Sequence, residues 1–144
     1  MFLGEHTHAL DEKKRLTLPV KLRKAVGKGV VVTRGLDGCL FLYPDKEWKG
    51  ISGKLAALGM GQSDTRGFAR FMLAGAVETE VDSAGRILVP EHLREFAAIK
   101  SSVVVAGVAN RLEIWDESRW KSYAASVAKA ADAMAEKLGQ VGAI

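Results

Sequence analysis

The amino-acid sequence predicts an α+β protein with a mainly β core, in which two copies of one supersecondary unit pack together and short helices lie at the periphery. Hydrophobic residues make up 48% and charged residues 26% of the 144 residues, which is typical of a globular chain with an apolar core. The motif DEKKRLTLP at residues 11–19 recurs 71 positions later, at 82–90, as DSAGRILVP. A chain of this length makes about one domain, so we expect the two copies to share a core.

The repeat continues beyond this motif and organises the whole chain. The offset is 71 through the first short helix and becomes 72 after one inserted residue. Matched positions include Leu22 with Leu93, Arg23 with Arg94, Val31 with Val103, Gly35 with Gly107, and Trp48 with Trp120. Such a series in constant order indicates duplication of one supersecondary unit. We therefore divide the chain into a first unit, 1–62, and a second unit, 63–144.

Each unit predicts the same order of elements: a strand, a charged turn, a second strand, a short helix, a hairpin and a closing helix. Alternating apolar and polar residues at 77–81 are typical of a half-buried strand. Pro19 and Pro90 each end a strand and open a helix, and Gly35 and Gly38 mark a hairpin turn. The predicted strands are 7–10, 16–18, 30–33, 40–43, 77–81, 87–89, 103–106 and 112–115, and the predicted short helices are 20–26 and 91–97.

Longer helices are predicted at three places. Trp48 lies in the first turn of the helix that closes the first unit, and a helix at 64–74 follows Ser63 as its expected N-cap. The C-terminal helix is amphipathic, with an apolar stripe at coiled-coil spacing. The stripe is formed by Trp120, Ala124, Val127, Ala131, Met134 and Leu138. We expect this stripe to pack against the protein's own body; a neighbouring subunit is the alternative.

Several classes of function are disfavoured. Cys39 is the one cysteine, which excludes an internal disulfide, and its apolar strand favours a small core residue. His6 and His8 lie on one side of a strand without a clear third ligand, so no metal site is predicted. No nucleophile elbow, phosphate loop or dinucleotide motif is present. We expect no enzyme, no cofactor, no small-molecule substrate, no membrane span and no signal peptide, and a cytoplasmic location.

The positive charge is concentrated near the N-terminus. Residues 11–34 hold eight of the 21 Lys and Arg residues and two of the 17 Asp and Glu residues. The rest of the chain holds 13 basic and 15 acidic residues. A basic patch on a nearly neutral body favours a partner such as the phosphate backbone of nucleic acid, and a solvated basic face without a partner is the alternative.

The repeated Asp-x-x-x-Arg turn is the candidate site. An arginine fork can donate two hydrogen bonds to guanine, so we predict that Arg15 contacts DNA and that Lys13 and Lys14 neutralise phosphates. Arg86 is the counterpart of Arg15, for which contact and a structural role are both open. An aspartate four residues earlier, at Asp11 and Asp82, could hold the guanidinium or cap the turn. The alternative is that both pairs only stabilise their turns.

These features, together with MFLG at the N-terminus, TRGLDGCLFLYP at 33–44, GA at 75–76 and EIW at 113–115, resemble the MraZ family of bacterial transcriptional regulators. The resemblance covers residues 1 to about 123. It implies that each unit is an AbrB-like swapped-hairpin element and that the two form a pseudo-twofold double-split β-barrel. It also implies a homo-oligomeric ring, associated with the nucleoid, that binds short G-rich direct repeats in double-stranded promoter DNA. Such a ring usually represses its own division and cell wall operon.

One position departs from the family pattern, and two other functions stay open. The family loop generally reads Asp-x-Lys-Gly-Arg, and the second copy keeps Gly85 where the first has Lys14. If the turn needs a positive φ, a lysine costs about 1 kcal/mol or more, so we expect altered loop geometry or an altered phosphate contact. The alternatives to the operon repressor are an AbrB-type antitoxin or global nucleoid regulator, and a structural oligomer without a DNA role.

Overall fold

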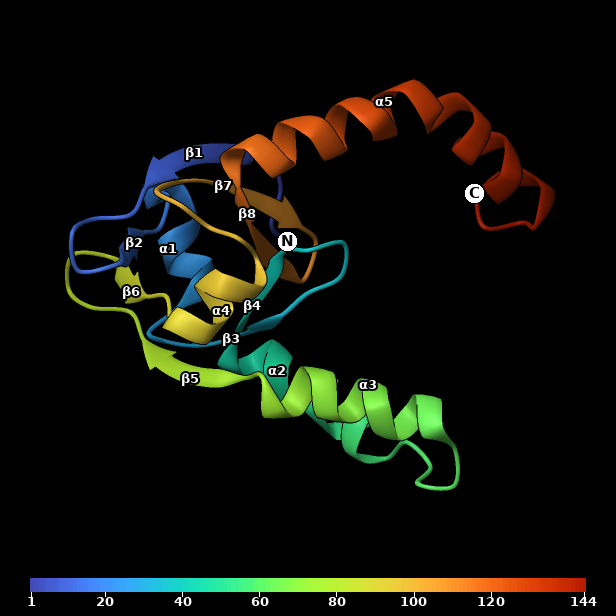
Figure 1. The fold of residues 1–144 in the computed structure, drawn as a ribbon, viewed down its shortest axis with the longest axis horizontal. Coiled ribbons are helices and arrows are strands. Elements are labelled where there is room, and N and C mark those ends of the chain that lie inside the picture. Colours follow the sequence, from blue (N-terminus) through green and yellow to red (C-terminus); the bar gives the residue numbers. More distant parts are fainter.

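The computed structural model describes all 144 residues and shows a mixed α+β fold with a mainly β core (Figure 1). The predicted fold class is thus confirmed at this level. The strands are β1 (Glu5–Ala9), β2 (Arg15–Thr17), β3 (Gly29–Arg34), β4 (Leu40–Pro44), β5 (Val77–Glu80), β6 (Arg86–Leu88), β7 (Ser102–Val108) and β8 (Arg111–Asp116). The helices are α1 (Val20–Val26), α2 (Asp45–Ala56), α3 (Ser63–Ala74), α4 (Glu91–Phe96) and α5 (Glu117–Gln140).

The two repeat units exchange strands. The larger sheet is antiparallel with the order β1-β7-β8-β4-β3-β5. In it, β1 of the first unit pairs with β7 of the second, and β5 of the second unit pairs with β3 of the first. A separate ladder pairs β2 with β6, with Leu16 opposite Ile87. Because neither unit has a sheet of its own, each depends on the other for its hydrogen-bonded neighbours.

The main core is shared in the same way. Leu16 and Ile87 are 0% and 1% exposed, and burial of each such side chain contributes about 1.5–3 kcal/mol. The cluster takes in both helices that follow the prolines and both hairpins. Its buried members are Phe2, Leu16, Leu18, Leu22, Val26, Val30, Val32, Leu40, Leu42, Ile87, Val89, Leu93, Ala97, Val103, Val105, Leu112 and Ile114. Both copies of the repeat therefore contribute to one core, and in the strand and helix around each proline they do so with equivalent positions, such as Leu16 with Ile87 and Leu22 with Leu93.

A second, smaller cluster lies on the other face of the hairpins, where the longer helices begin. Cys39 is fully buried in it, next to Trp115 at 3% exposure, as expected of small and aromatic core residues. Trp48 and Trp120 pack against this cluster while partly exposed. The cluster attaches the longer helices to the sheet.

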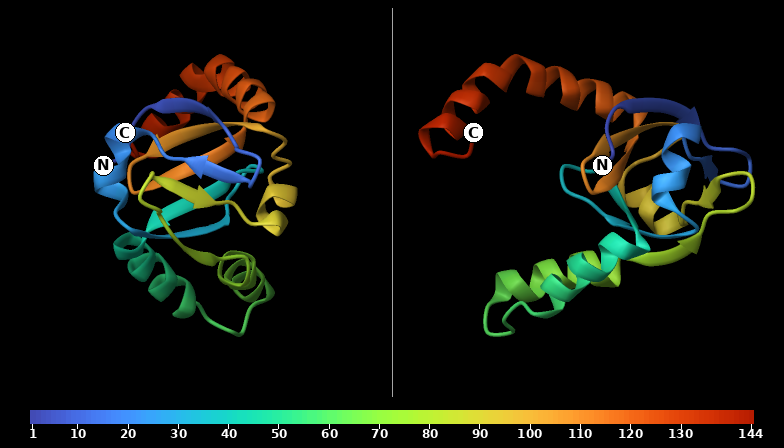
Figure 2. Two further views of the ribbon diagram at one scale, coloured as in Figure 1. Left: turned by 90° about the vertical axis from the view of Figure 1, so that its left-hand side faces the viewer. Right: turned by 180° about the vertical axis from the view of Figure 1, so that it is seen from behind.

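Two helical arms project from the body. The α2–α3 pair and α5 extend to one side, and the turns that precede β2 and β6 lie at the opposite end of the molecule (Figures 1 and 2). None of the helices combines the length and the apolar character needed to cross a membrane.

The expected packing of the α5 stripe on the protein's own body is wrong beyond the first turns. Trp120 and Tyr123 contact Trp115, with ring centroids 5.4 and 4.8 Å away. No α5 residue is buried, and Met134 and Leu138 are each 44% exposed. At 1.5 Å per residue the 24-residue helix is about 36 Å long, and most of it projects away from the body (Figure 1).

The prediction that Ser63 is the N-cap of α3 is also wrong. Ser63 is the first helical residue, and Gln62 occupies the N-cap position without a side-chain capping bond. The Thr65 hydroxyl donates instead to the backbone carbonyl of Gln62 at 3.0 Å, and it also contacts the carbonyl of Gly59. The preceding loop is therefore held by a threonine inside the helix.

Candidate nucleic-acid interface

The two Asp-x-x-x-Arg loops lie side by side at one end of the molecule. The chain enters β2 and β6 from these loops, and the β2–β6 ladder brings them together across the unit boundary. Each loop accepts a hydrogen bond from the other unit: the N–H of Leu18 donates to the carbonyl of Gly85 at 2.8 Å, and that of Val89 to Lys14 at 3.1 Å. The sequence repeat alone does not show this juxtaposition.

Asp11 organises the first loop with both carboxylate oxygens. Oδ1 accepts from the backbone N–H groups of Lys13 and Arg15, each at 2.9 Å. Oδ2 accepts from Nε of Arg15 at 2.8 Å. The carboxylate thus caps the turn and holds the guanidinium at the same time.

Asp82 makes the same set of bonds in the second loop. Its Oδ1 accepts from the N–H groups of Ala84 and Arg86, each at 2.9 Å, and its Oδ2 accepts from Nε of Arg86 at 2.8 Å. The two loops are therefore copies in geometry as well as in sequence.

These bonds stabilise the ionised form of both carboxyl groups. The backbone N–H of Arg15 is the main cause that lowers the pKa of Asp11, and its guanidinium lowers it further. Arg86 lowers the pKa of Asp82 in the same way. Both loops therefore carry a carboxylate at neutral pH, paired with an arginine.

The left-handed position of the turn falls on one of the residues at which the two copies differ. Lys14 has φ 63° and Gly85 has φ 78°. The N–H of Lys14 donates to the carbonyl of Asp11 at 3.0 Å, and that of Gly85 to Asp82 at 2.9 Å. The expected change in loop geometry is therefore wrong: the lysine adopts the left-handed conformation at an energetic cost, and the turn closes as it does around glycine.

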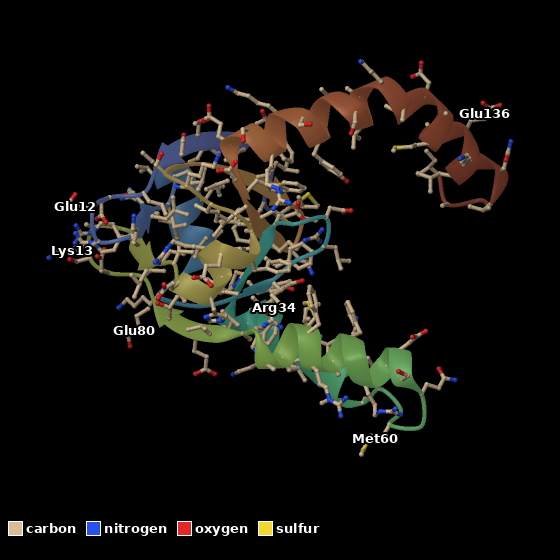
Figure 3. The ribbon with its side chains drawn as sticks, viewed as in Figure 1. Glu12, Lys13, Arg34, Met60, Glu80 and Glu136 are labelled. Atoms are coloured by element: carbon tan, nitrogen blue, oxygen red, sulfur yellow. The ribbon has the colours of Figure 1, made fainter.

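The arginine forks retain donors for a ligand. The side chain of Arg15 is 27% exposed and that of Arg86 is 34% exposed. In each, Nε is bound to the aspartate, and the two Nη atoms make no hydrogen bond or ion pair within the protein. Lys13 and Lys14 are exposed, and Figure 3 shows Lys13 beside Glu12 at the tip of the first loop, away from the body.

One set of cations was not assigned a role from the sequence. Arg23, Lys24 and Lys28 line a hollow beside Ser83 and Gly85 of the second loop. The basic stretch at 11–34 contains all three, but their neighbour is a loop about 60 residues away in the sequence. The exchange of strands between the two units brings these three cations next to the second loop.

The remaining candidates lie elsewhere. His6 and His8 are partly buried on one face of β1, as their spacing predicts. Burial, followed by the charges of His6 and Arg23, lowers the pKa of His8. Cys39 is fully buried, and burial raises the pKa of its thiol, which is the state of a core cysteine.

Fold and site together define a class of protein: a duplicated, strand-exchanged α+β module that presents two aspartate-anchored arginine loops on a basic end. The family model described as "MraZ protein, putative antitoxin-like" matches residues 1–71 and 72–140. The chain belongs to the MraZ family.

Curated relatives match over nearly their whole length. The transcriptional regulator MraZ of Heliobacterium modesticaldum is 51% identical over 138 residues, 96% of each chain. The protein of the same name from Acetivibrio thermocellus is 44% identical over 142 residues, 99% of each chain. That from Caldanaerobacter subterraneus subsp. tengcongensis is 46% identical over 138 residues, 96% of each chain.

Proposed function

We propose that this chain is a sequence-specific, DNA-binding transcriptional regulator that reads duplex DNA with the Asp11–Arg15 loop, with Asp82–Arg86 as its counterpart. The observation that carries the proposal is the pair of aspartate-anchored arginines held side by side at the basic end. The naming of the relatives as transcriptional regulators supports it.

The chemistry follows from the free atoms of the loop. Asp11 fixes Nε of Arg15, so the two Nη donors are oriented before binding and can meet O6 and N7 of a guanine in the major groove. Lys13 and Lys14 would neutralise neighbouring phosphates and set the register of the loop. Asp11 and Asp82 act as positioning residues. Arg86 supplies a second fork of the same geometry.

A purely structural role for the ion pairs is the weaker interpretation. Exposed ion pairs contribute about 0–1 kcal/mol to stability, and the capping bonds from the same carboxylates hold the turns without any arginine. Two partly exposed guanidinium groups with unpaired Nη atoms are better explained by a ligand. The lysines beside Arg15 supply the positive charge that a phosphate backbone requires.

The finer proposal concerns assembly and target. One loop pair offers few contacts, so tight binding requires several subunits on tandem sites. We propose a ring-shaped homo-oligomer that binds short G-rich direct repeats and represses its own division and cell wall operon on the nucleoid. The exposed apolar stripe of α5 supports assembly, since Met134 and Leu138 find no partner within the chain.

The proposed fold is the pseudo-twofold, AbrB-like double-split barrel made from units 1–62 and 63–144. The exchange of β1 and β5 between units supports it. A second candidate function, an AbrB-type antitoxin, is favoured by the antitoxin-like description of the family model. A toxin gene next to this one would favour the antitoxin, whereas a methyltransferase gene and division genes would favour the operon regulator.

The test is binding to the DNA upstream of the protein's own gene, at several salt concentrations, for wild type and Arg15→Ala. We expect tight wild-type binding, lost in Arg15→Ala, with an unchanged oligomeric state by light scattering. Arg70→Ala, an exposed arginine on α3, is the matched control and should bind like wild type. Weak binding that is equal in all three proteins would leave only non-specific phosphate attraction and overturn the proposal.

A further inference from the structure

The two Asp-x-x-x-Arg loops differ in the number of lysines that they contain. In the first loop Lys13 and Lys14 precede the arginine, whereas the second loop has Ala84 and Gly85 at these positions. If both arginine forks approach DNA, the second loop has no lysine with which to hold the neighbouring phosphate.

A basic hollow lies beside the second loop. It has a volume of about 560 Å³ and lies between the end of α1 and the loop. Its charged lining is Arg23, Lys24 and Lys28 on one side, and it faces Asp82, Ser83 and Gly85 on the other. Asp82 is already paired with Arg86 at 2.8 Å, so the three cations of α1 and the following turn leave the hollow positive.

The position of Arg23 depends on Gly85. A Cβ atom at position 85 would lie 2.3 Å from Nε of Arg23, so the guanidinium packs directly on the glycine. Nε of Arg23 donates to the carbonyl of Leu18 at 2.9 Å, and its Nη atoms make no bond within the protein. Lys28 is tied to the same loop, because its carbonyl accepts from the N–H of Val81 at 2.8 Å.

The equivalent hollow of the other unit has a different charge. It is lined by Glu91, Arg94 and Glu95 of α4 together with Ala98, Ile99 and Lys100. By the offset of 71, Glu95 stands where the first unit has Lys24, and Arg94 where it has Arg23. This hollow takes in no residue of the Asp11–Arg15 loop. The charged side chains of this hollow are two acidic and two basic, whereas the side of the first hollow formed by α1 and the following turn carries three basic side chains and no acidic one.

We propose that the hollow formed by Arg23, Lys24 and Lys28 beside the second loop binds a backbone phosphate of duplex DNA. This inference rests on the proposed DNA-binding function and extends it. The first loop holds its phosphate with its own lysines, and the second loop uses cations from the other repeat unit. Each arginine fork is then accompanied by two or three cations, and the duplex is held on both sides of the pseudo-twofold axis.

The test uses Lys24→Gln/Lys28→Gln, since both side chains are exposed and neither makes a side-chain hydrogen bond. The matched control is Lys54→Gln/Lys129→Gln, which removes two exposed charges from the helical arms. Binding to the promoter duplex and to an unrelated duplex is measured between about 0.05 and 0.3 M salt. Loss of this phosphate contact should lower the slope of log affinity against log salt by about one, and weaken binding about fivefold at ~0.15 M salt for both duplexes.

The outcomes separate this inference from the function on which it rests. A slope equal to that of the control pair, with Arg15-dependent promoter binding intact, would overturn the phosphate site alone. Absence of promoter binding in the wild type would overturn the proposed function. Lys24→Arg/Lys28→Arg keeps the charge and should retain the wild-type slope; a lowered slope in this variant would show that the first effect came from a structural change and would reject the site.

Discussion

Lys14 and Gly85 occupy the same left-handed position in the two loops, with φ of 63° and 78°, and each carbonyl accepts a hydrogen bond from the opposite unit. The donors are Val89 for Lys14 and Leu18 for Gly85. The left-handed position, at which one copy has lysine and the other glycine, therefore lies where the two loops are joined. Substitutions at Lys14 test the charge and the backbone strain of this position, and substitutions at Gly85 test its packing against Arg23.

Replacing Lys14 with glycine should stabilise the fold and weaken DNA binding together. Glycine removes a left-handed strain of about 1 kcal/mol, which should raise the free energy of unfolding in urea by about that amount. Loss of the charge should lower the salt slope of DNA binding by about one. Lys14→Ala is the control: it should lower the slope equally without the gain in stability. Equal stabilities of the two variants would show that the turn is not strained.

Replacing Gly85 with alanine should be destabilising. The added Cβ would lie 2.3 Å from Nε of Arg23 and would also occupy a left-handed φ. We expect a loss of about 1–3 kcal/mol in thermal or urea unfolding. Gly50→Ala within α2 meets no atom within 4 Å and should be neutral or stabilising by about 0.5–1 kcal/mol. A stable Gly85→Ala protein would mean that Arg23 moves freely, which would weaken the case for a pre-formed phosphate hollow.

Local chemistry and periodicity were sufficient to predict the elements of this fold. The turn prolines and the repeat place α1 at 20–26, where it is observed, and every predicted strand is present within two residues at each end. Because Asp11 lies four residues before Arg15, the sequence also predicted that its carboxylate could cap the turn, and it does so. These features depend on neighbours that are close in the sequence.

The features that could not be predicted depend on partners far away in the sequence. The repeat shows two equivalent units, but it does not show that β1 pairs with β7 in the other unit. Arg23 beside Gly85 follows from that exchange and has no local signal. The stripe of α5 is the opposite case: its periodicity predicts an apolar face, and that face is present, but the pattern cannot show whether the body of the same chain covers it.

Protonation of Asp11 and Asp82 should weaken the hydrogen bonds that hold the two loops, and it should do so only at a pH below the ordinary pKa of aspartate. Hydrogen bonds from Arg15 and Arg86 lower the pKa of Asp11 and Asp82 from the usual 3.8. The carboxylates then contribute their full stabilisation above the pKa of the unfolded chain, and this is lost as pH falls through the lower folded pKa. The amide NMR signals of Lys13 and Arg15 should follow a transition with a midpoint below 3.8.

The second loop is the internal control for this titration. Asp11→Asn keeps one oxygen that can accept from the N–H groups of the turn but has no ionisable group, so it should abolish the transition at Lys13 and leave that at Ala84 unchanged. A wild-type midpoint at or above 3.8 would contradict the assigned role of the two carboxylates.

Lysines on the α5 stripe should disrupt assembly without unfolding the subunit. Met134 and Leu138 are each 44% exposed and contact no core cluster, so Met134→Lys/Leu138→Lys should change the free energy of unfolding by no more than about 0.5 kcal/mol. If α5 carries the contact between subunits, light scattering should show a smaller particle. Binding to tandem promoter repeats should then weaken far more than binding to a single repeat, because the gain in effective concentration is lost. The control, Ser122→Lys/Ala125→Lys, adds the same charge on the opposite face of α5 and should assemble like wild type. An unchanged particle in the stripe variant would place the subunit contact elsewhere, and the exposed stripe would then require a different partner.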